Sequence, residues 1–236
     1  LPMLGKGRAV YLGVEMDGAE AMAKAGIQPV ETLVYKEGLG MTNGTCAMTS
    51  VGTLAWYDSF CAAQLADVIG SMTLEALTGL LNAYDERVHL VRGHKGQLQV
   101  AKNFRLLTEG SEILSNCQND RVQDAYSLRC IPQVHGAIRD ALDYVKDKIE
   151  IELNAVTDNP LLFPDDEAVI SGGNFHGEPM ALAFDFMGIA CSEIAGTSGF
   201  GRLHPILCKP GGHGFDGYHR RQKIRLDCSE HPVCPR

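Results

Sequence analysis

Aromatic residues, basic residues and long apolar stretches are all scarce in this sequence of 236 residues. Aromatic side chains make up 7% of the chain, and 21 Lys and Arg stand against 29 Asp and Glu, which gives a net charge of −8. No charge-free stretch reaches the ~18 to 20 apolar residues that cross a bilayer, because Gly, Ser, Thr and Gln interrupt each one. We therefore expect neither nucleic acid nor a membrane as a partner, since no positive field attracts phosphate groups or anionic lipid.

Cysteine pairs at the spacing of a metal site are missing as well. Five of the eight cysteines are scattered along the chain: Cys46, Cys61, Cys117, Cys130 and Cys191. Such cysteines are typical of reduced, buried thiols. Residues 1–5 also lack the basic start and the apolar run of a signal peptide. We expect a cytoplasmic protein without a metal site.

The composition changes abruptly near residue 196. Residues 197–236 hold seven Lys and Arg and three Asp and Glu, whereas the preceding part holds 14 and 26. This segment has no apolar repeat at the spacing of a helix or a strand, so we expect a disordered tail over 196–236. It is a basic tail, a zinc knuckle built from Cys228, His231 and Cys234, or a set of non-native residues from a frame-shifted message. We favour the last, because the zinc ligands lack the usual paired spacing.

Apolar residues recur at helical spacing over much of residues 46–195. The clearest pattern lies between Pro132 and Val156, where six residues repeat at steps of three or four: Val134, Ile138, Leu142, Val145, Ile149 and Leu153. One stripe of this helix is expected to be buried. Residues 46–69 predict a second long helix whose broad apolar face includes Val51, Leu54, Ala62, Leu65 and Ile69.

Other segments predict shorter elements and a third long helix. Residues 73–83 and 96–108 have helical patterns separated by a polar loop, and residues 178–195 are apolar on nearly all sides of a helix. Residues 9–25 predict a small hairpin, with a turn at Asp17-Gly18, and a short helix. We therefore predict a mainly α fold, a bundle of long helices with a small N-terminal hairpin.

Four motifs follow one another along the chain. They are Lys36-Glu37-Gly38-Leu39 with Asn43-Gly44-Thr45, then Gln123-Asp124-Ala125-Tyr126-Ser127-Leu128-Arg129-Cys130 with Pro132-Gln133-Val134, then Thr157-Asp158-Asn159-Pro160, then Ser171-Gly172-Gly173-Asn174-Phe175-His176-Gly177-Glu178-Pro179. Together they closely resemble the histidine ammonia-lyase branch of the aromatic amino acid lyase family. The resemblance covers about residues 1–195, which we interpret as a partial ammonia-lyase domain, and the tail resembles nothing in the family.

The resemblance implies a carbon–nitrogen lyase of histidine catabolism, which converts L-histidine to trans-urocanate and ammonia. It implies no metal or diffusible cofactor, because the family uses a methylidene-imidazolone electrophile that forms from an Ala-Ser-Gly tripeptide. Family members are homotetramers of long helices, with active sites assembled from more than one subunit. The expected partners are therefore L-histidine or another aromatic amino acid and further copies of the chain.

The Ala-Ser-Gly tripeptide occurs nowhere in this sequence. In the family it lies just before a segment that resembles residues 1–7, so we expect the chain to begin after the electrophile and to be a middle fragment. Ser198-Gly199 lies in the aberrant tail and is not counted as a substitute. We therefore expect the chain to be inactive alone.

The second motif supplies three candidate site residues. Arg129 is expected to bind the substrate carboxylate, because a guanidinium presents a planar fork of donors, and a structural ion pair is the alternative. Tyr126, three residues earlier, would donate its hydroxyl to the electrophile or the carboxylate, and a core aromatic is the alternative. Gln123 would place an amide near the electrophile, unless it is a surface residue.

The first and fourth motifs supply one candidate each. Asn43 would bond the electrophile or the polar end of the substrate, and helix capping is its alternative role. Phe175 would pack on the electrophile and exclude water, or it belongs to an ordinary core. No histidine is assigned an acid–base role.

Two further functions stay open. One alternative is a fragment of a phenylalanine or tyrosine ammonia-lyase or of an aminomutase. Ser127, Cys130 and residues 132–136 resemble the histidine branch more, but the resemblance implies that the residues that read the substrate ring lie mostly in an N-terminal part that we expect to be missing. Alternatively it is a non-catalytic partner that contacts full-length subunits through its helices, because apolar faces left uncovered favour association.

Overall fold

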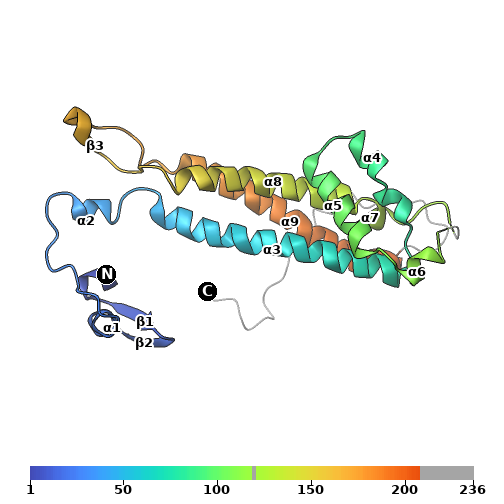
Figure 1. The fold of residues 1–236 in the computed structure, drawn as a ribbon, viewed down its shortest axis with the longest axis horizontal. Helices are drawn as coiled ribbons and strands as arrows, with labels where there is room; N and C mark the ends of the chain where they lie inside the picture. The colour runs from blue at the N-terminus through green and yellow to red at the C-terminus, as the bar shows by residue number, and fades with distance from the viewer. Residues whose placement is uncertain (119–120, 208–236) are drawn as a thin grey trace. The chain divides into compact units, whose positions relative to one another are not determined.

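The computed structural model describes residues 1–118 and 121–207, with side chains described as far as residue 196. The described part is mainly helical, as the sequence predicted (Figure 1). It divides into two compact units. Unit 1 consists of Leu1–Trp56 and Val145–Asp185, and unit 2 consists of Tyr57–Tyr144 and Phe186–Arg236.

The three predicted long helices are present with different ends. Helix α3 spans Cys46–Ala76, α8 spans Ile131–Glu152 and α9 spans Glu178–Leu207. Helix α9 therefore continues through residues 197–207, which were expected to lack regular structure. Residues 208–236, with the three possible zinc ligands, lie outside the described residues, and the division at residue 195 stays a prediction.

Four of the six residues of the apolar stripe predicted along α8 are buried, whereas Val134 is half-buried and Leu153, just after the helix, is exposed. Ile138, Leu142, Val145 and Ile149 are each at most 3% exposed. On α3, in contrast, four of the five predicted face residues are more than half exposed: Val51, Leu54, Leu65 and Ile69. The buried side of α3 within unit 2 carries Ala63, Asp67, Ser71 and Leu74, of which only Leu74 is a large apolar residue. Periodicity identified the helix and its apolar face, but most of that face is exposed in this chain.

The N-terminal hairpin is confirmed, with its turn at a different place. Strand β1 (Arg8–Tyr11) pairs antiparallel with β2 (Val14–Asp17), and α1 (Gly18–Lys24) follows directly. The turn lies at Leu12-Gly13, where both residues have positive φ angles of 48° and 81°. Asp17-Gly18 instead begins the helix, since Asp17 is its N-cap residue. This part of unit 1 also contains a short 3₁₀ turn, η1 (Pro2–Leu4), and the one-turn helix α2 (Glu37–Gly40).

A second hairpin in unit 1 was not predicted. Strands β3 (Leu161–Phe163) and β4 (Ala168–Ile170) pair antiparallel across a 3₁₀ turn, η3 (Pro164–Asp166). Each strand has three residues, which is too short for alternation of polar and apolar residues to be visible.

The short elements of unit 2 surround the C-terminal end of α3. They are η2 (Leu81–Tyr84), α4 (Glu86–Leu90), α5 (Lys95–Leu107), α6 (Glu112–Ser115) and α7 (Tyr126–Arg129). The predicted helix over 73–83 is wrong, because α3 runs through to residue 76 and η2 follows. Helix α4 forms inside the predicted polar loop because Asp85 caps it, its carboxylate accepting the N–H of Arg87 at 2.9 Å.

A buried polar cluster joins three helices of unit 2. The carboxylate of Asp67 on α3 is 2% exposed and accepts bonds from Arg139 at 2.7 Å and from Asn103 at 2.7 Å. Its other oxygen lies 2.9 Å from Nδ1 of His135. Asn103 lies on α5, and both His135 and Arg139 lie on α8. We call these four residues the Asp67 cluster.

Helices α5 and α8 approach each other backbone to backbone where two glycines meet. A Cβ atom on Gly136 would collide with the backbone of Gln97 and would lie 2.8 Å from the carbonyl carbon of Gly96. A Cβ atom on Gly96 would collide with the carbonyl oxygen of Gly136. The N–H of Gly96 donates to the carboxylate of Asp140 at 2.7 Å, which closes this contact.

Two expectations on composition need correction. The described cysteines are free, as expected, but Cys46 and Cys61 are exposed and the other three are only partly buried. The first part of α9, Glu178–Gly196, is long and apolar enough to cross a bilayer by length and composition, with a mean hydropathy of 1.2. The interrupted sequence pattern therefore understated how apolar this helix is, although a core helix of a bundle has the same composition.

Candidate functional site

The one-turn helix α7 carries two of the candidate residues of unit 2. Tyr126 begins the turn and Arg129 ends it, so the two share one face, as the three-residue spacing predicted. Tyr126 is 70% exposed, which does not fit the core alternative. Arg129 is partly buried, and its Nε donates to the carbonyl oxygen of Asp124 at 2.9 Å. Within the described residues, Arg129 forms no ion pair.

A buried tyrosine in the core of unit 2 is hydrogen-bonded to the backbone of this turn. Tyr84 is fully buried, stacks on Phe104 with ring centroids 4.6 Å apart, and donates its hydroxyl to the carbonyl of Leu128 at 2.7 Å. Burial, followed by the neighbouring Asp124 carboxylate, raises the pKa of Tyr84 far above its ordinary value. The hydroxyl is therefore a permanent donor, and it fixes the backbone of α7 between Tyr126 and Arg129.

Gln123 lies just before α7 and is exposed. Asp124, which separates Gln123 from the turn, has a side chain only 2% exposed. Within this motif, the side chain of Asp124 is therefore buried in unit 2, whereas that of its neighbour Gln123 lies at the surface.

In unit 1, the first and third motifs are joined by one lysine. Lys36 donates through Nζ to the carboxylate of Asp158 and to the carbonyl of Pro160, both at 2.7 Å. The bond to Lys36, with a further bond from the backbone of Asn159, lowers the pKa of Asp158. This pair fixes the Lys36 segment to the loop after α8.

The third motif in turn holds the loop of the fourth. The side-chain oxygen of Asn159 accepts the N–H of Gly172 at 2.8 Å and the hydroxyl of Ser171 at 3.0 Å. Phe175 follows in this loop and is 45% exposed, so it is not an ordinary core residue of unit 1. The loop that carries Phe175 is therefore anchored at its beginning by Asn159.

Asn43 lies in the loop before α3, next to Gly44, a position that only glycine can occupy. Gly44 has φ of 86°, and a Cβ there would collide with the carbonyl of Thr157. Thr45 is buried and donates its hydroxyl to Glu152 at 2.5 Å. Asn43 itself is exposed, and its side chain makes no hydrogen bond within the described residues, so its alternative role as a helix cap is not seen.

The five candidates thus fall into two sets, each built by its own unit. Tyr126, Arg129 and Gln123 belong to unit 2, and Asn43 and Phe175 belong to unit 1. Sequence reasoning missed the side chains that anchor these sets: Lys36, Asp124 and Asn159. All three lie inside the quoted motifs, but nothing in a motif tells an anchoring residue from a residue that meets substrate.

Comparison with known proteins agrees with the motifs. The family model for aromatic amino acid lyases matches residues 1–204. The chain is 56% identical over 198 residues to a histidine ammonia-lyase of Caldanaerobacter subterraneus subsp. tengcongensis, and 55% identical to that of Alkaliphilus metalliredigens. Each match covers 84% of this chain and 39% of the relative, so the chain spans about two fifths of the length of these curated relatives.

Solved structures give the same assignment. A tyrosine aminomutase from Streptomyces globisporus superposes with a TM-score of 0.76 at 35% identity, over 85% of this chain and 41% of that one. A histidine ammonia-lyase from Trypanosoma cruzi superposes with a TM-score of 0.72 at 38% identity, over 84% and 37%. The family model covers far more than half of the chain, and the fold agrees with it. The chain belongs to the aromatic amino acid lyase family.

Proposed function

We propose that this chain is part of a histidine ammonia-lyase, an enzyme that removes ammonia from L-histidine to form trans-urocanate. The observation that carries the proposal is the 56% identity over 198 residues to a protein of that name. The same proposal includes a cytoplasmic location and assembly with further copies. Assembly is supported by the apolar side of α3, whose residues Val51, Leu54 and Leu65 are more than half exposed.

The residues of this chain would supply binding and positioning. The β-proton of histidine is weakly acidic, so elimination needs a base, an acceptor for the amine and a fixed substrate. Arg129 would hold the substrate carboxylate through its terminal nitrogens. Tyr126, on the same face of α7, would donate a hydrogen bond beside it, and Gln123 would add an amide. Asn43 and Phe175 would contact the amine-holding group and exclude water from it.

The electrophile implied by the family resemblance is not provided by the residues of this chain. A methylidene-imidazolone forms from Ala-Ser-Gly, and the sequence contains no such tripeptide. We therefore assign no step to that group here, and we propose that the chain alone does not turn over L-histidine.

Purified chain incubated with L-histidine is expected to form no urocanate, measured by the ultraviolet absorbance of the product. A full-length lyase that carries this segment, assayed in parallel, serves as the positive control and should convert L-histidine. Sustained urocanate formation that scales with the concentration of the pure chain would refute the inactivity of the chain. Absence of turnover by the full-length enzyme would refute the histidine assignment.

A phenylalanine or tyrosine lyase or an aminomutase is the second candidate. It is favoured by the superposition on the tyrosine aminomutase, at a TM-score of 0.76. The full-length enzyme should be offered L-tyrosine and L-phenylalanine at the same concentration as L-histidine, with β-amino acids analysed among the products. A higher kcat/KM for either of these substrates would support this candidate over the first.

Arg129→Lys in the full-length enzyme is expected to lower kcat/KM for L-histidine by about 10- to 150-fold, because a lost bidentate, charge-assisted pair costs roughly 1.5 to 3 kcal/mol. Steady-state kinetics should show a raised KM. Arg87→Lys is the matched control, since Arg87 also lies in unit 2 but its side chain is 87% exposed. Kinetics within twofold of the parent for Arg129→Lys would return Arg129 to a structural role.

A further inference from the structure

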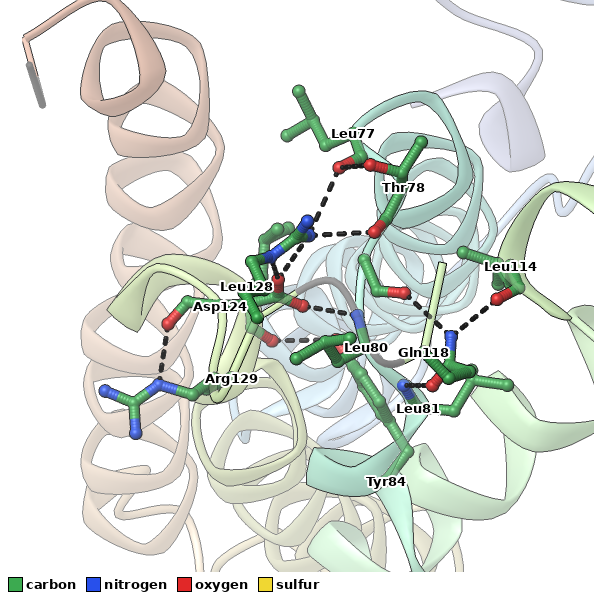
Figure 2. Close-up of polar contacts among 12 residues, drawn as sticks. Leu77, Thr78, Leu80, Leu81, Tyr84, Leu114, Gln118, Asp124, Leu128 and Arg129 are labelled. Carbon is green, nitrogen blue, oxygen red and sulfur yellow. Dashed lines mark hydrogen bonds and ion pairs between the residues drawn. The ribbon is translucent and has the colours of Figure 1, made fainter. Parts of the chain in front are cut away.

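The carboxylate of Asp124, just before the turn that carries Arg129, forms hydrogen bonds that connect this turn to the segment after α3. One oxygen of this carboxylate accepts the N–H of Leu80 at 2.6 Å, and the other accepts Nε of Arg121 at 2.6 Å (Figure 2). The Asp124 side chain is 2% exposed, so these bonds are shielded from water. Asp124 therefore links two segments that are 44 residues apart in the chain.

Arg121 and Gln118 complete the attachment. Arg121 donates through Nη2 to the carbonyls of Thr78 at 2.8 Å and Leu77 at 3.3 Å, just after the last turn of α3. The carbonyl of Leu77 also accepts the hydroxyl of Thr78 at 2.7 Å. Gln118 accepts the N–H of Leu81 at 2.8 Å and donates to the carbonyl of Leu114 at 2.7 Å. The segment after α3 is thus held by hydrogen bonds from the side chains of Asp124, Arg121 and Gln118 (Figure 2).

The main chain of Asp124 acts on Arg129 directly. Its carbonyl accepts Nε of Arg129 at 2.9 Å, which fixes the rotation of the guanidinium plane. With Nε occupied, the edge formed by Nη1 and Nη2 is the one left for a bidentate partner. Within the described residues, no carboxylate pairs with that edge.

We propose that Asp124 is a positioning residue for Arg129. Its carboxylate anchors the backbone just before α7, and its carbonyl orients the guanidinium so that Nη1 and Nη2 face an incoming substrate carboxylate. This inference rests on the proposed function, since it assumes that Arg129 binds the carboxylate of an amino acid. It adds to that function a residue that never meets the substrate but determines how well it is bound.

The test uses the full-length enzyme with Asp124→Asn, which keeps the size of the side chain and removes its charge. KM for L-histidine is expected to rise by about 5- to 30-fold, because a buried charge-assisted bond is lost. Two competitive inhibitors separate positioning from a general structural defect. Binding of imidazolepropionate, which has the carboxylate, should weaken by a similar factor, whereas binding of histamine, which lacks it, should stay within twofold.

A double-mutant cycle with Arg129→Lys provides the second readout. If Asp124 acts through Arg129, then Asp124→Asn should change KM by less than twofold in the Arg129→Lys background. Asp85→Asn is the control, because Asp85 also pairs with an arginine of unit 2, at 2.6 Å, and that arginine, Arg87, lies outside α7 and its support. It should leave KM and both inhibition constants unchanged.

Three results would overturn the inference while the parent enzyme still deaminates L-histidine. These are equal weakening of both inhibitors, additive effects of the two substitutions, and unchanged KM in Asp124→Asn. If Asp124→Asn is recovered unfolded, Arg121→Gln tests the same attachment through a partly exposed residue, and unchanged imidazolepropionate binding in that variant overturns the inference. Failure of the parent enzyme to deaminate L-histidine would count against the proposed function instead.

Discussion

Replacement of Asp67 by alanine should lower the free energy of unfolding of the chain by about 3 to 5 kcal/mol, because it removes one partner of a buried ion pair and leaves the other charge without compensation. Arg139 is 13% exposed on its side chain and would lose its carboxylate. Asn103 and His135 would lose a partner as well, so three side chains on two further helices are affected.

Urea denaturation followed by far-ultraviolet circular dichroism measures this loss. Asp143→Ala is the matched control, since Asp143 is an exposed aspartate on α8 in the same unit, and its replacement should change stability by no more than about 0.5 kcal/mol. A loss below about 1 kcal/mol for Asp67→Ala would mean that water reaches the Asp67 cluster and compensates the exposed charge.

Gly136→Ala is expected to destabilise the chain by about 3 kcal/mol, at the upper end of what overpacking a core costs. The added methyl group would meet the backbone of Gln97 and Gly96 rather than a flexible side chain, so α5 and α8 must separate. Separation also stretches the bond between the N–H of Gly96 and the carboxylate of Asp140. Thermal and urea denaturation both report the change.

The control for this substitution is Gly188→Ala, another helical glycine of unit 2. A Cβ at Gly188 meets nothing within 4 Å. The higher helix propensity of alanine should therefore raise stability by up to about 1 kcal/mol. If Gly136→Ala also stabilised the chain, the close approach of α5 and α8 would be absent in solution.

The apolar periodicity predicted helices better than it predicted their buried faces. Ile138 and Leu142 repeat at helical spacing and are buried, because this part of α8 has packing partners within unit 2. Leu54 and Leu65 repeat equally well on α3 and stay exposed. Spacing shows that a face is apolar, but which element covers it depends on residues distant in sequence.

The candidate site could be predicted only as far as local spacing determines it. The three-residue step from Tyr126 to Arg129 places both on one face of α7, which the structure confirms. The bond from Asp124 to Leu80 spans 44 residues and had no local signal. The same holds for the bond between the N–H of Gly172 and the side chain of Asn159, which are 13 residues apart.

The discontinuity of unit 1 sets an order for events during synthesis. Its two parts, Leu1–Trp56 and Val145–Asp185, are separated by about 90 residues that belong to unit 2. At ~5 to 20 residues per second, the ribosome needs roughly 5 to 20 s to make that intervening stretch. Lys36 therefore leaves the ribosome long before Asp158, and the nascent N-terminal part must stay soluble without its partner segment while unit 2 begins to fold.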